Sequence, residues 1–301
     1  MNTAIKGVII PAATPFSPDG EVNYQAILHN IERWNKTEVA GYMCLGSYGE
    51  FKALSDEESL QIIRLYAETR SPRKVYIVGI ARESTYQTLK FMDSILSQDI
   101  TPDYFSALTP SYFRSLMTDS ALVRYYTEIA DHSSVPILLY CAPKFANEVC
   151  LSETAVAELA SHPNIAGIKD TSSNMIKKYF GKVGMRDDFE IISGSLSNLE
   201  ACIRLGGVAG VLSAGNYIPN HCSRIFSIWD SDRENFDKYL AKIKTFVKLT
   251  GGSKGVVSLK YSMDCNGYLG GPARKPIEEL DKESKKHIRE AFKQMDSYFG
   301  G

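Results

Sequence analysis

The segment NIAGIKDTSS, at residues 164–173, places a lysine directly after apolar and small residues that are typical of a buried strand. A lysine amine held among apolar groups loses solvation, which disfavours its charged form and lowers its pKa. The neutral amine can attack a carbonyl carbon and form a Schiff base. Lys169 is therefore the first candidate nucleophile, and a lysine that leaves the core for solvent beside Asp170 is the alternative.

Other side chains that could do chemistry also follow apolar segments. Tyr140 ends the segment PILLY, and its phenol could pass protons to and from a substrate oxygen. Ser47, Tyr48 and Gly49 lie in the turn LGSYGE, whose glycines permit backbone N–H groups to converge on an anion such as a carboxylate. Arg82 follows KVYIVGI and could meet an acidic end of a substrate. A core tyrosine, an ordinary tight turn and a solvated arginine are the respective alternatives.

The elements that would position these side chains form a regular series. Eight short apolar segments lack the alternation of half-exposed strands, so they indicate a parallel sheet buried on both faces. They are GVII (7–10), GYMCL (41–45), KVYIVGI (74–80), YFSAL (104–108), PILLY (136–140), IAGIK (165–169), FEIIS (189–193) and VAGVLS (208–213). Helical patterns separate them, such as the capping box of Ser55 and Glu58 and the helical spacing of Leu89, Met92 and Leu96.

Strand and helix alternating in this way predict an α/β fold, a (β/α)8 TIM barrel, with a doubly wound open sheet as the alternative. Strand patterns stop after about residue 232, so we expect a catalytic barrel over 1–232 and a C-terminal helical extension over 233–301. Barrel enzymes carry their chemistry at the carboxyl ends of the strands. Gly194 and Leu212, at the ends of the seventh and eighth segments, therefore join the candidates for substrate binding.

Composition narrows the possible partners. The 301 residues are 44% hydrophobic and carry a formal net charge of −1, which gives no reason to expect nucleic acid or a membrane surface as a partner. The N-terminal stretch does not resemble a signal peptide, and we expect a cytoplasmic protein. The six cysteines are expected to be reduced, mostly buried thiols. With every histidine in or beside a predicted helix and no ligand cluster or nucleotide-binding motif in the sequence, we expect chemistry without a metal or cofactor.

Four motifs follow one another along the chain: GSYGE (46–50), TPSYF (109–113), LLYCAP (138–143) and GIKD (167–170). In order and spacing they resemble the dihydrodipicolinate synthase and N-acetylneuraminate lyase family. The resemblance implies a class I aldolase that acts on pyruvate, with Lys169 forming the Schiff base and Tyr140 transferring protons. It also implies that Ser47 hydrogen-bonds Tyr140, that Tyr112 reaches in from a neighbouring subunit of a homotetramer, and that backbone N–H groups of Ser47 and Tyr48 hold the pyruvate carboxylate.

One departure from the family narrows the substrate. Phe145 stands where the synthases carry an arginine that binds the carboxylate of the aldehyde substrate, and phenylalanine cannot pair with a carboxylate. It would also crowd the long sugar tail that a sialic acid lyase accepts. The stretches RESTYQT (82–88) and GYLGGPARKPIEEL (267–280) resemble the 4-hydroxy-2-oxoglutarate aldolases and 2-keto-3-deoxy-sugar-acid aldolases.

We therefore expect cleavage of such a 2-keto acid to pyruvate and an aldehyde. The alternatives are a 4-hydroxy-tetrahydrodipicolinate synthase, an N-acetylneuraminate lyase, a Schiff-base dehydratase or hydratase-aldolase, and a catalytically silent ligand-binding barrel. A barrel that binds phosphate through SGS (193–195) and SAGN (213–216) is a further alternative.

Overall fold

The computed structural model describes residues 5–172 and 174–300 and contains a closed barrel of parallel strands in the order β1 to β8. The strands are β1 (Gly7–Pro11), β2 (Gly41–Cys44), β3 (Val75–Gly79), β4 (Tyr104–Leu108), β5 (Ile137–Cys141), β6 (Ile165–Asp170), β7 (Glu190–Ser193) and β8 (Ala209–Val211). Each of the eight apolar segments of the sequence overlaps one of these strands, and β1, β5 and β6 each end one residue beyond the predicted segment. The (β/α)8 barrel is confirmed, and the open-sheet alternative is wrong.

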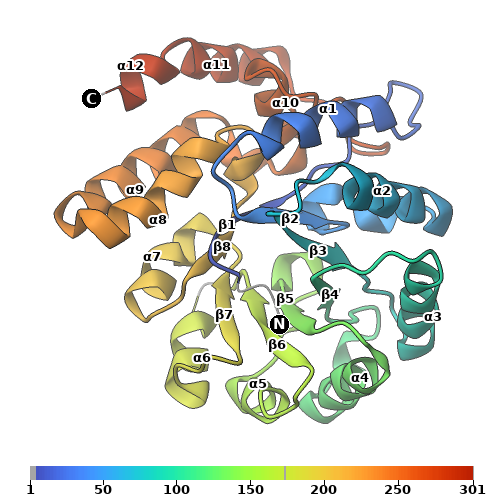
Figure 1. Cartoon of the computed structure of the whole chain (residues 1–301). Coiled ribbons are helices and arrows are strands. Elements are labelled where there is room, and N and C mark those ends of the chain that lie inside the picture. The colour runs from blue at the N-terminus through green and yellow to red at the C-terminus, as the bar shows by residue number, and fades with distance from the viewer. Residues whose placement is uncertain (1–4, 173, 301) are drawn as a thin grey trace. The chain divides into compact units, whose positions relative to one another are not determined.

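The chain packs as two compact units, and the first contains residues 41–45 and 75–211. Its helices are α3 (Thr85–Leu96), α4 (Asp119–His132), α5 (Glu153–Leu159), α6 (Met175–Val183) and α7 (Leu196–Arg204). Figure 1 shows α3 to α6 outside the neighbouring strands β3 to β7. The helices α3, α4 and α5 are capped by the preceding residues Ser84, Thr118 and Ser152, whose side chains accept a backbone N–H of the first turn.

The second unit contains residues 8–40, 46–74 and 212–300. Its helices are α1 (Tyr24–Asn35), α2 (Asp56–Thr69), α8 (Pro219–Ser231), α9 (Arg233–Leu249), α10 (Val256–Cys265), α11 (Lys282–Lys293) and α12 (Met295–Phe299). The capping box of Ser55 and Glu58 is confirmed at the start of α2. The helical character expected after residue 232 is confirmed by α9 to α12. The domain boundary at residue 232 stays a prediction.

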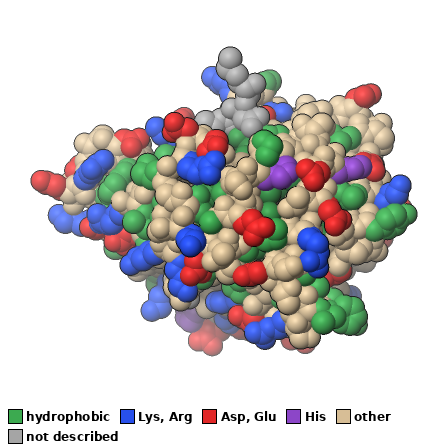
Figure 2. All heavy atoms as spheres, turned by 90° about the horizontal axis from the view of Figure 1, so that it is seen from below, with side chains coloured by type: hydrophobic (Ala, Val, Ile, Leu, Met, Phe, Trp, Pro, Cys, Tyr) green, Lys and Arg blue, Asp and Glu red, His purple; other side chains and the backbone are tan. Residues whose placement is uncertain are grey.

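The surface and the polar side chains agree with the balanced composition. On the face drawn in Figure 2, Lys and Arg side chains are interspersed with Asp and Glu side chains of the described residues. Two of the histidines make hydrogen bonds to carboxylates near helix ends, His132 with Asp93 at 2.7 Å and His162 with Asp131 at 3.0 Å. Within residues 5–172 and 174–300, no helix is long and apolar enough to cross a membrane.

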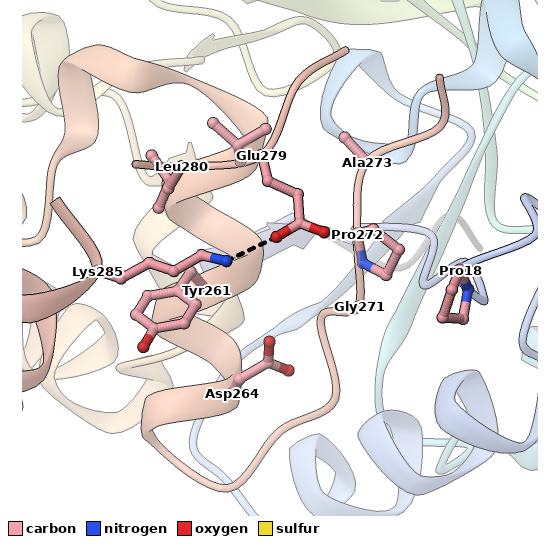
Figure 3. Close-up of a pocket in the computed structure, with 10 residues that line it drawn as sticks. Pro18, Tyr261, Asp264, Gly271, Pro272, Ala273, Glu279, Leu280 and Lys285 are labelled. Atoms are coloured by element: carbon pink, nitrogen blue, oxygen red, sulfur yellow. Dashed lines mark hydrogen bonds and ion pairs between the residues drawn. The ribbon is translucent and has the colours of Figure 1, made fainter. Parts of the chain in front are cut away.

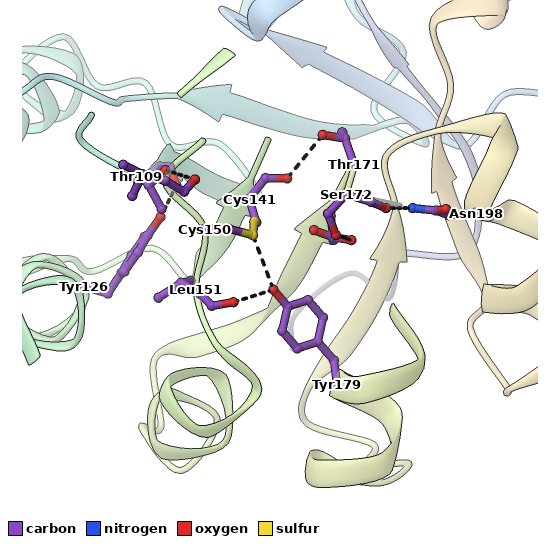
Figure 4. Close-up of a disulfide and its surroundings, with 12 residues drawn as sticks. Thr109, Tyr126, Cys141, Cys150, Leu151, Thr171, Ser172, Tyr179 and Asn198 are labelled. Atoms are coloured by element: carbon purple, nitrogen blue, oxygen red, sulfur yellow. Dashed lines mark hydrogen bonds between the residues drawn. A yellow bond between two sulfur atoms is a disulfide. The ribbon is translucent and has the colours of Figure 1, made fainter. Parts of the chain in front are cut away.

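The cysteines correct one expectation. Cys44, Cys202 and Cys222 are free and buried and Cys265 is free and half-buried, as expected, but Cys141 and Cys150 form a disulfide (Figure 4). Cys141 ends β5, and the chain turns back through the 3-10 turn Pro143–Phe145 so that the two Cα atoms lie 5.4 Å apart. The expectation of reduced thiols was wrong at this pair because a separation of nine residues does not reveal that return.

Candidate active site

Lys169 lies on β6 with its side chain inside the core. Only 4% of the residue is exposed. Its Nζ lies 3.6 Å from the thioether sulfur of Met43, to which it donates a hydrogen bond, and 3.7 Å from the centroid of the Tyr140 ring. Lys169 therefore does not leave the core for solvent.

The surroundings of Lys169 make its amine reactive. A thioether and an aromatic ring replace few of the hydrogen bonds that water gives an ammonium group, so the charged form is disfavoured. Burial lowers the pKa of Lys169 from 10.5 to about 7. A large fraction of the amine is thus neutral near pH 7, as a Schiff-base lysine requires.

Tyr140 lies on β5 directly beside Lys169. The two residues are partners in the parallel register of β5 and β6, so successive side chains on these strands alternate together between the two faces of the sheet. Tyr140 is buried, with 3% exposed. The strands therefore bring together the two residues that the sequence placed at the centre of the chemistry.

The candidates Ser47, Tyr48 and Gly49 form a 3-10 turn in the second unit. The Thr14 hydroxyl donates a 2.7 Å hydrogen bond to the Gly49 carbonyl, and a Cβ added at Gly49 would lie 3.1 Å from the carbonyl oxygen of a neighbouring segment. Glu50 closes the turn in a left-handed conformation, with φ of 53°. The turn is tightly held, and anion binding by its N–H groups stays a prediction.

A buried ion pair anchors the end of that turn. The Lys260 Nζ lies 2.5 Å from Glu50 Oε1, and the side chains are 1% and 6% exposed. The other carboxylate oxygen of Glu50 accepts the backbone N–H of Arg274, and Lys260 also donates to the Pro272 carbonyl. Burial lowers the pKa of Lys260, and the Glu50 carboxylate opposes that shift. The pairing partner lies more than 200 residues away, so sequence reasoning missed it.

Tyr112 lies in the loop after β4 and is 76% exposed. The Glu83 carboxylate fixes the backbone of this loop by accepting the N–H groups of Ser111 and Tyr112 at 2.7 and 2.9 Å. The Tyr112 ring meets the Phe113 ring edge to face at 4.8 Å. Glu83 is a positioning group that the sequence did not single out, and a role for Tyr112 in a neighbouring subunit stays a prediction.

The remaining candidates occupy different settings. Phe145 is 46% exposed in the segment after β5. The Arg82 guanidinium lies 3.8 Å above the Phe91 ring and donates to the Ala81 carbonyl. Leu212 is buried and donates its N–H to Ile9. Their contacts with substrate stay predictions.

Gly194 closes the end of β7 against the end of β6. Its N–H donates a 2.7 Å hydrogen bond to the Asp170 carbonyl. A Cβ at this position would lie 2.5 Å from the Thr171 side chain and 2.9 Å from that same carbonyl oxygen, which is closer than real Cβ atoms approach. Gly194 therefore lets β7 pack against the strand that carries Lys169.

Asp170 is a buried carboxyl group that sequence reasoning did not assign. Its side chain accepts a 2.7 Å hydrogen bond from Ser172, and burial raises its pKa to about 6. Its carboxylate and the sulfurs of Cys141 and Cys150 lie within 4.8 Å of one another. The sequence suggested no such cluster because its members come from separate segments.

A cavity of about 260 Å³ lies in the second unit beside the C-terminal helices (Figure 3). Lys285 on α11 makes a 2.6 Å ion pair with Glu279 there, and Tyr261 and Asp264 of α10 line the same space. The described lining holds none of the predicted site residues. Glu279 is 68% exposed, so this open cavity does not compete with the buried Lys169 as a place for covalent chemistry.

The comparison with known proteins decides the family. The model of the dihydrodipicolinate synthetase family matches residues 4–295. The chain belongs to this family. It is an enzyme of the class I aldolase and lyase type that the family comprises.

Several relatives match over nearly their whole length. A DapA-like lyase of Thermococcus kodakarensis, itself uncharacterized, is 30% identical over 95% of this chain and 98% of the relative. A probable mitochondrial 4-hydroxy-2-oxoglutarate aldolase of Emericella nidulans is 28% identical over 96% of this chain and 94% of its own length. A 4-hydroxy-tetrahydrodipicolinate synthase of Brachyspira hyodysenteriae is 25% identical over 94% and 95%. The relatives thus carry more than one substrate name.

Solved structures match equally well. YagE, a prophage protein of the same family from E. coli K12 that was solved with pyruvate, superposes with a TM-score of 0.87 at 25% identity, covering 98% of this chain and 99% of that one. A 4-hydroxy-tetrahydrodipicolinate synthase from Methylacidiphilum fumariolicum SolV superposes with a TM-score of 0.89 at 22% identity, covering 99% and 98%. The second likeness adds support for the fold alone.

Proposed function

We propose that this enzyme cleaves a 2-keto-3-deoxy sugar acid or 4-hydroxy-2-oxoglutarate to pyruvate and an aldehyde through a Schiff base on Lys169. The observation that carries the proposal is the buried Lys169 amine, 3.7 Å from the Tyr140 ring centroid, with a pKa lowered to about 7. A buried amine that lies beside the Met43 sulfur and the Tyr140 ring, with a pKa lowered by burial, is suited to attack a ketone rather than to hold an ion pair.

The proposed reaction follows from that amine. The neutral Lys169 amine attacks the keto carbon, loss of water gives a protonated imine, and the imine withdraws electrons as the C3–C4 bond breaks. Tyr140 gives its proton to the hydroxyl that leaves as this water, and its phenolate then takes the proton of the C4 hydroxyl, so the C4 fragment leaves as an aldehyde. The enamine that remains takes a proton at C3, and hydrolysis of the imine releases pyruvate and the free lysine. The steps proposed here use a covalent bond to Lys169, proton transfer and charge stabilisation by groups of the chain.

Phe145 supports the choice of substrate. It is the last residue of the 3-10 turn Pro143–Phe145, four residues after the end of β5 at Cys141 and five after Tyr140. A synthase places an arginine there for the aldehyde's carboxylate, and a phenyl ring offers no donor for that group. We therefore assign a substrate whose aldehyde-forming end is bound without a cation at residue 145. The 4-hydroxy-2-oxoglutarate and 2-keto-3-deoxy-sugar-acid classes are the ones we propose.

Tyr112 supports a shared active site in the proposed tetramer. Tyr112 and Phe113 are 76% and 63% exposed, so one chain leaves both rings open to a second copy. Mixing a Tyr112→Phe chain with a Lys169→Ala chain tests this proposal. If Tyr112 acts across subunits, mixed oligomers regain activity because an intact Lys169 meets an intact Tyr112; if it acts within its own chain, or not at all, mixing restores nothing.

The deciding experiment for the function is reductive trapping. The full-length protein is incubated with pyruvate and borohydride, and peptide mass spectrometry locates the adduct. We expect a reduced pyruvyl group on Lys169 and none in Lys169→Ala, whose fold is checked by circular dichroism. No adduct on the folded wild-type protein would overturn the Schiff-base assignment and favour a silent barrel.

A substrate panel then separates the activities. We expect release of pyruvate and an aldehyde from 4-hydroxy-2-oxoglutarate or from 2-keto-3-deoxy acids. Lys260→Arg, which keeps a cation opposite Glu50, is the matched lysine control and should still give the trapped adduct. Condensation of pyruvate with aspartate semialdehyde as the preferred reaction would point to a synthase, and loss of water without an aldehyde would point to a dehydratase.

A further inference from the structure

A cluster of sulfur, carboxyl and phenol groups lies behind the Lys169–Tyr140 pair. Cys141 follows Tyr140 on β5, and Asp170 follows Lys169 on β6. Cys141 and Asp170 are register partners, as Tyr140 and Lys169 are. Successive side chains of a strand point to opposite faces. Cys141 and Asp170 therefore face away from Lys169.

The helix side of these strands completes the cluster. The hydroxyl of Tyr179, on α6, lies 3.8 Å from the Cys150 sulfur and donates a 2.8 Å hydrogen bond to the Leu151 carbonyl (Figure 4). Tyr179 is buried. It thus ties the segment that carries Cys150 to α6.

Asp170 supplies a proton-holding group to this cluster. Its side chain is fully buried, and Oδ1 has no hydrogen-bond partner among the described residues, although Oδ2 accepts from Ser172. The carboxylate and both sulfurs lie within 4.8 Å of one another. A buried carboxyl group whose pKa is raised to about 6 can both donate and accept a proton near neutral pH. None of the steps proposed for Lys169 uses it.

The two sulfurs differ in accessibility. Cys141 is 0% exposed, whereas Cys150 is half-buried at the edge of the segment. Thiol–disulfide exchange begins with a thiolate that attacks one sulfur while the other leaves. Because Cys150 is the more accessible of the two, we assign it as the sulfur that an external thiolate attacks, and Cys141 as the sulfur that leaves, beside Asp170.

The disulfide also closes a segment that adopts an unusual backbone. Asn147 and Glu148 have φ of 47° and 62°. Left-handed conformations at residues other than glycine persist when the surrounding structure holds them. One further tie is the hydrogen bond from the Asn147 side chain to the Ser111 carbonyl at 3.2 Å. Opening the disulfide removes the covalent tie from the segment that carries Phe145.

We propose that Cys141 and Cys150 form a reversible dithiol–disulfide site, which a small dithiol reductant opens and a low-molecular-weight disulfide closes, with Asp170 as its proton donor and acceptor. One thiolate of the reductant bonds to the Cys150 sulfur. The Cys141–Cys150 bond breaks, and its electron pair leaves on the Cys141 sulfur, which takes the proton of Asp170.

The second step completes the reduction. The other thiol of the reductant loses its proton to solvent and attacks the reductant sulfur that is bonded to Cys150. This forms the disulfide of the reductant and releases Cys150 as a thiolate, which takes a proton from solvent, as Asp170 does. Two electrons and two protons enter the protein, and the dithiol is oxidised by the same two electrons. The reverse sequence closes the site.

Differential alkylation tests the proposal on the full chain. The folded protein is treated with oxidised glutathione, its free thiols are blocked under denaturing conditions, and the remaining cysteines are reduced, labelled with a second reagent and located by mass spectrometry. We expect the second label on Cys141 and Cys150 alone. If the folded protein never forms this disulfide, the proposal is overturned.

Reduction of the native protein tests reversibility. With dithiothreitol under native conditions, once both thiols are released, Cys150 should be alkylated faster than the buried Cys141, and hydrogen exchange of residues 142–149 should rise. We expect Asp170→Asn to slow the native reduction by about 100-fold, as for loss of a general acid. Cys265→Ser, which removes a free half-buried thiol, should leave that rate unchanged.

Two further results complete the test. If Asp170→Asn does not fold, Cys150→Ser replaces it, and its buried Cys141 should then resist alkylation in the native protein. A wild-type disulfide that opens only on unfolding would make the bond purely structural and overturn the proposal. Because the readout is the mass of the thiols, a failure of the proposed aldolase activity leaves this test intact.

Discussion

The side-chain nitrogen of Lys169 lies 3.7 Å from the ring centroid of Tyr140, and the two residues are register partners on adjacent strands. Their separation is therefore set by the parallel ladder of β5 and β6 rather than by a loop. Sites held by regular strands keep their geometry more tightly than sites on loops. The nucleophile and the proposed proton carrier lie on adjacent barrel strands, so small structural changes elsewhere should not easily alter the distance between them.

The first prediction concerns the pH dependence of Schiff-base formation. Only the neutral amine attacks a ketone, so the initial rate of pyruvate trapping on Lys169 should rise with pH and level off above the pKa of about 7. The measurement is the rate of borohydride-trapped adduct, by mass spectrometry, from about pH 5 to pH 10. A midpoint near 10.5, the ordinary value, would contradict the desolvated lysine.

Tyr140→Phe separates imine formation from cleavage. The variant keeps the ring beside Lys169 and loses only the hydroxyl, so pyruvate should still be trapped. Turnover of the 2-keto acid substrate should fall by about 10²–10⁴-fold, the range for a general acid or base. Tyr126→Phe, which removes another buried hydroxyl that donates to the Ala107 carbonyl, is the control and should leave turnover within a few-fold. Normal turnover in Tyr140→Phe would mean that another group carries the proton.

Lys169→Met should stabilise the protein in a pH-dependent way. Folding lowers the pKa of Lys169 from 10.5 to about 7, so the folded state binds fewer protons than the unfolded state between these values. The cost of burying the ammonium is full below about pH 7 and disappears as the pH approaches 10.5. We expect the variant to gain a few kcal/mol at about pH 6, at ~1.4 kcal/mol per pKa unit, and less at about pH 9. Urea unfolding at both pH values measures this gain, and an equal gain at both would contradict it.

The barrel and the central pair could be predicted because their signals are local. Each buried strand is a short apolar segment, and Lys169 and Tyr140 each stand at the end of one. The spacing of Leu89, Met92 and Leu96 indicated the helix α3, but the buried face is formed by Thr88, Phe91, Met92 and Ile95. The predicted helical period was right. The predicted buried face was centred on the wrong residues because leucine side chains also cover the edge of a helix–sheet contact.

The rest of the site depends on contacts between distant segments. No local pattern joins Glu50 to Lys260, or brings Asp170 beside Cys141 and Cys150. The disulfide was missed because the 3-10 turn after β5 reverses the chain within nine residues, which the spacing of the two cysteines does not reveal. Buried polar pairs of this kind could be inferred only once the strand register was known.

The ion pair of Glu50 and Lys260 should contribute strongly to stability. Lys260→Met leaves the Glu50 carboxylate buried without its cation, and breaking a buried pair in this way costs about 3–5 kcal/mol. Adding Glu50→Gln removes the uncompensated charge, so the double variant should be more stable than the sum of the single changes. Urea unfolding of the four proteins of this cycle gives the coupling energy.

An exposed pair provides the comparison. Lys254 and Asp281 lie 3.0 Å apart, but their side chains are 46% and 58% exposed. Lys254→Met should cost less than about 1 kcal/mol, since water screens such pairs. Equal losses in the free energy of unfolding for Lys254→Met and Lys260→Met would contradict a larger contribution of the buried pair to stability.

Gly194→Ala tests the packing that supports Lys169. The new Cβ would lie 2.5 Å from the Thr171 side chain and 2.9 Å from the Asp170 carbonyl, so the ends of β6 and β7 must separate. We expect a loss of about 1–3 kcal/mol in the free energy of unfolding, typical of overpacking, and slower pyruvate trapping as Lys169 shifts.

Gly181→Ala is the matched control: Gly181 lies within α6, and a Cβ there meets nothing within 4 Å. Alanine in a helix is favoured over glycine by about 0.5–1 kcal/mol, so this variant should gain stability and keep its trapping rate. If Gly194→Ala were as stable and as reactive as Gly181→Ala, the close approach of β7 to β6 would not be what holds the lysine in place.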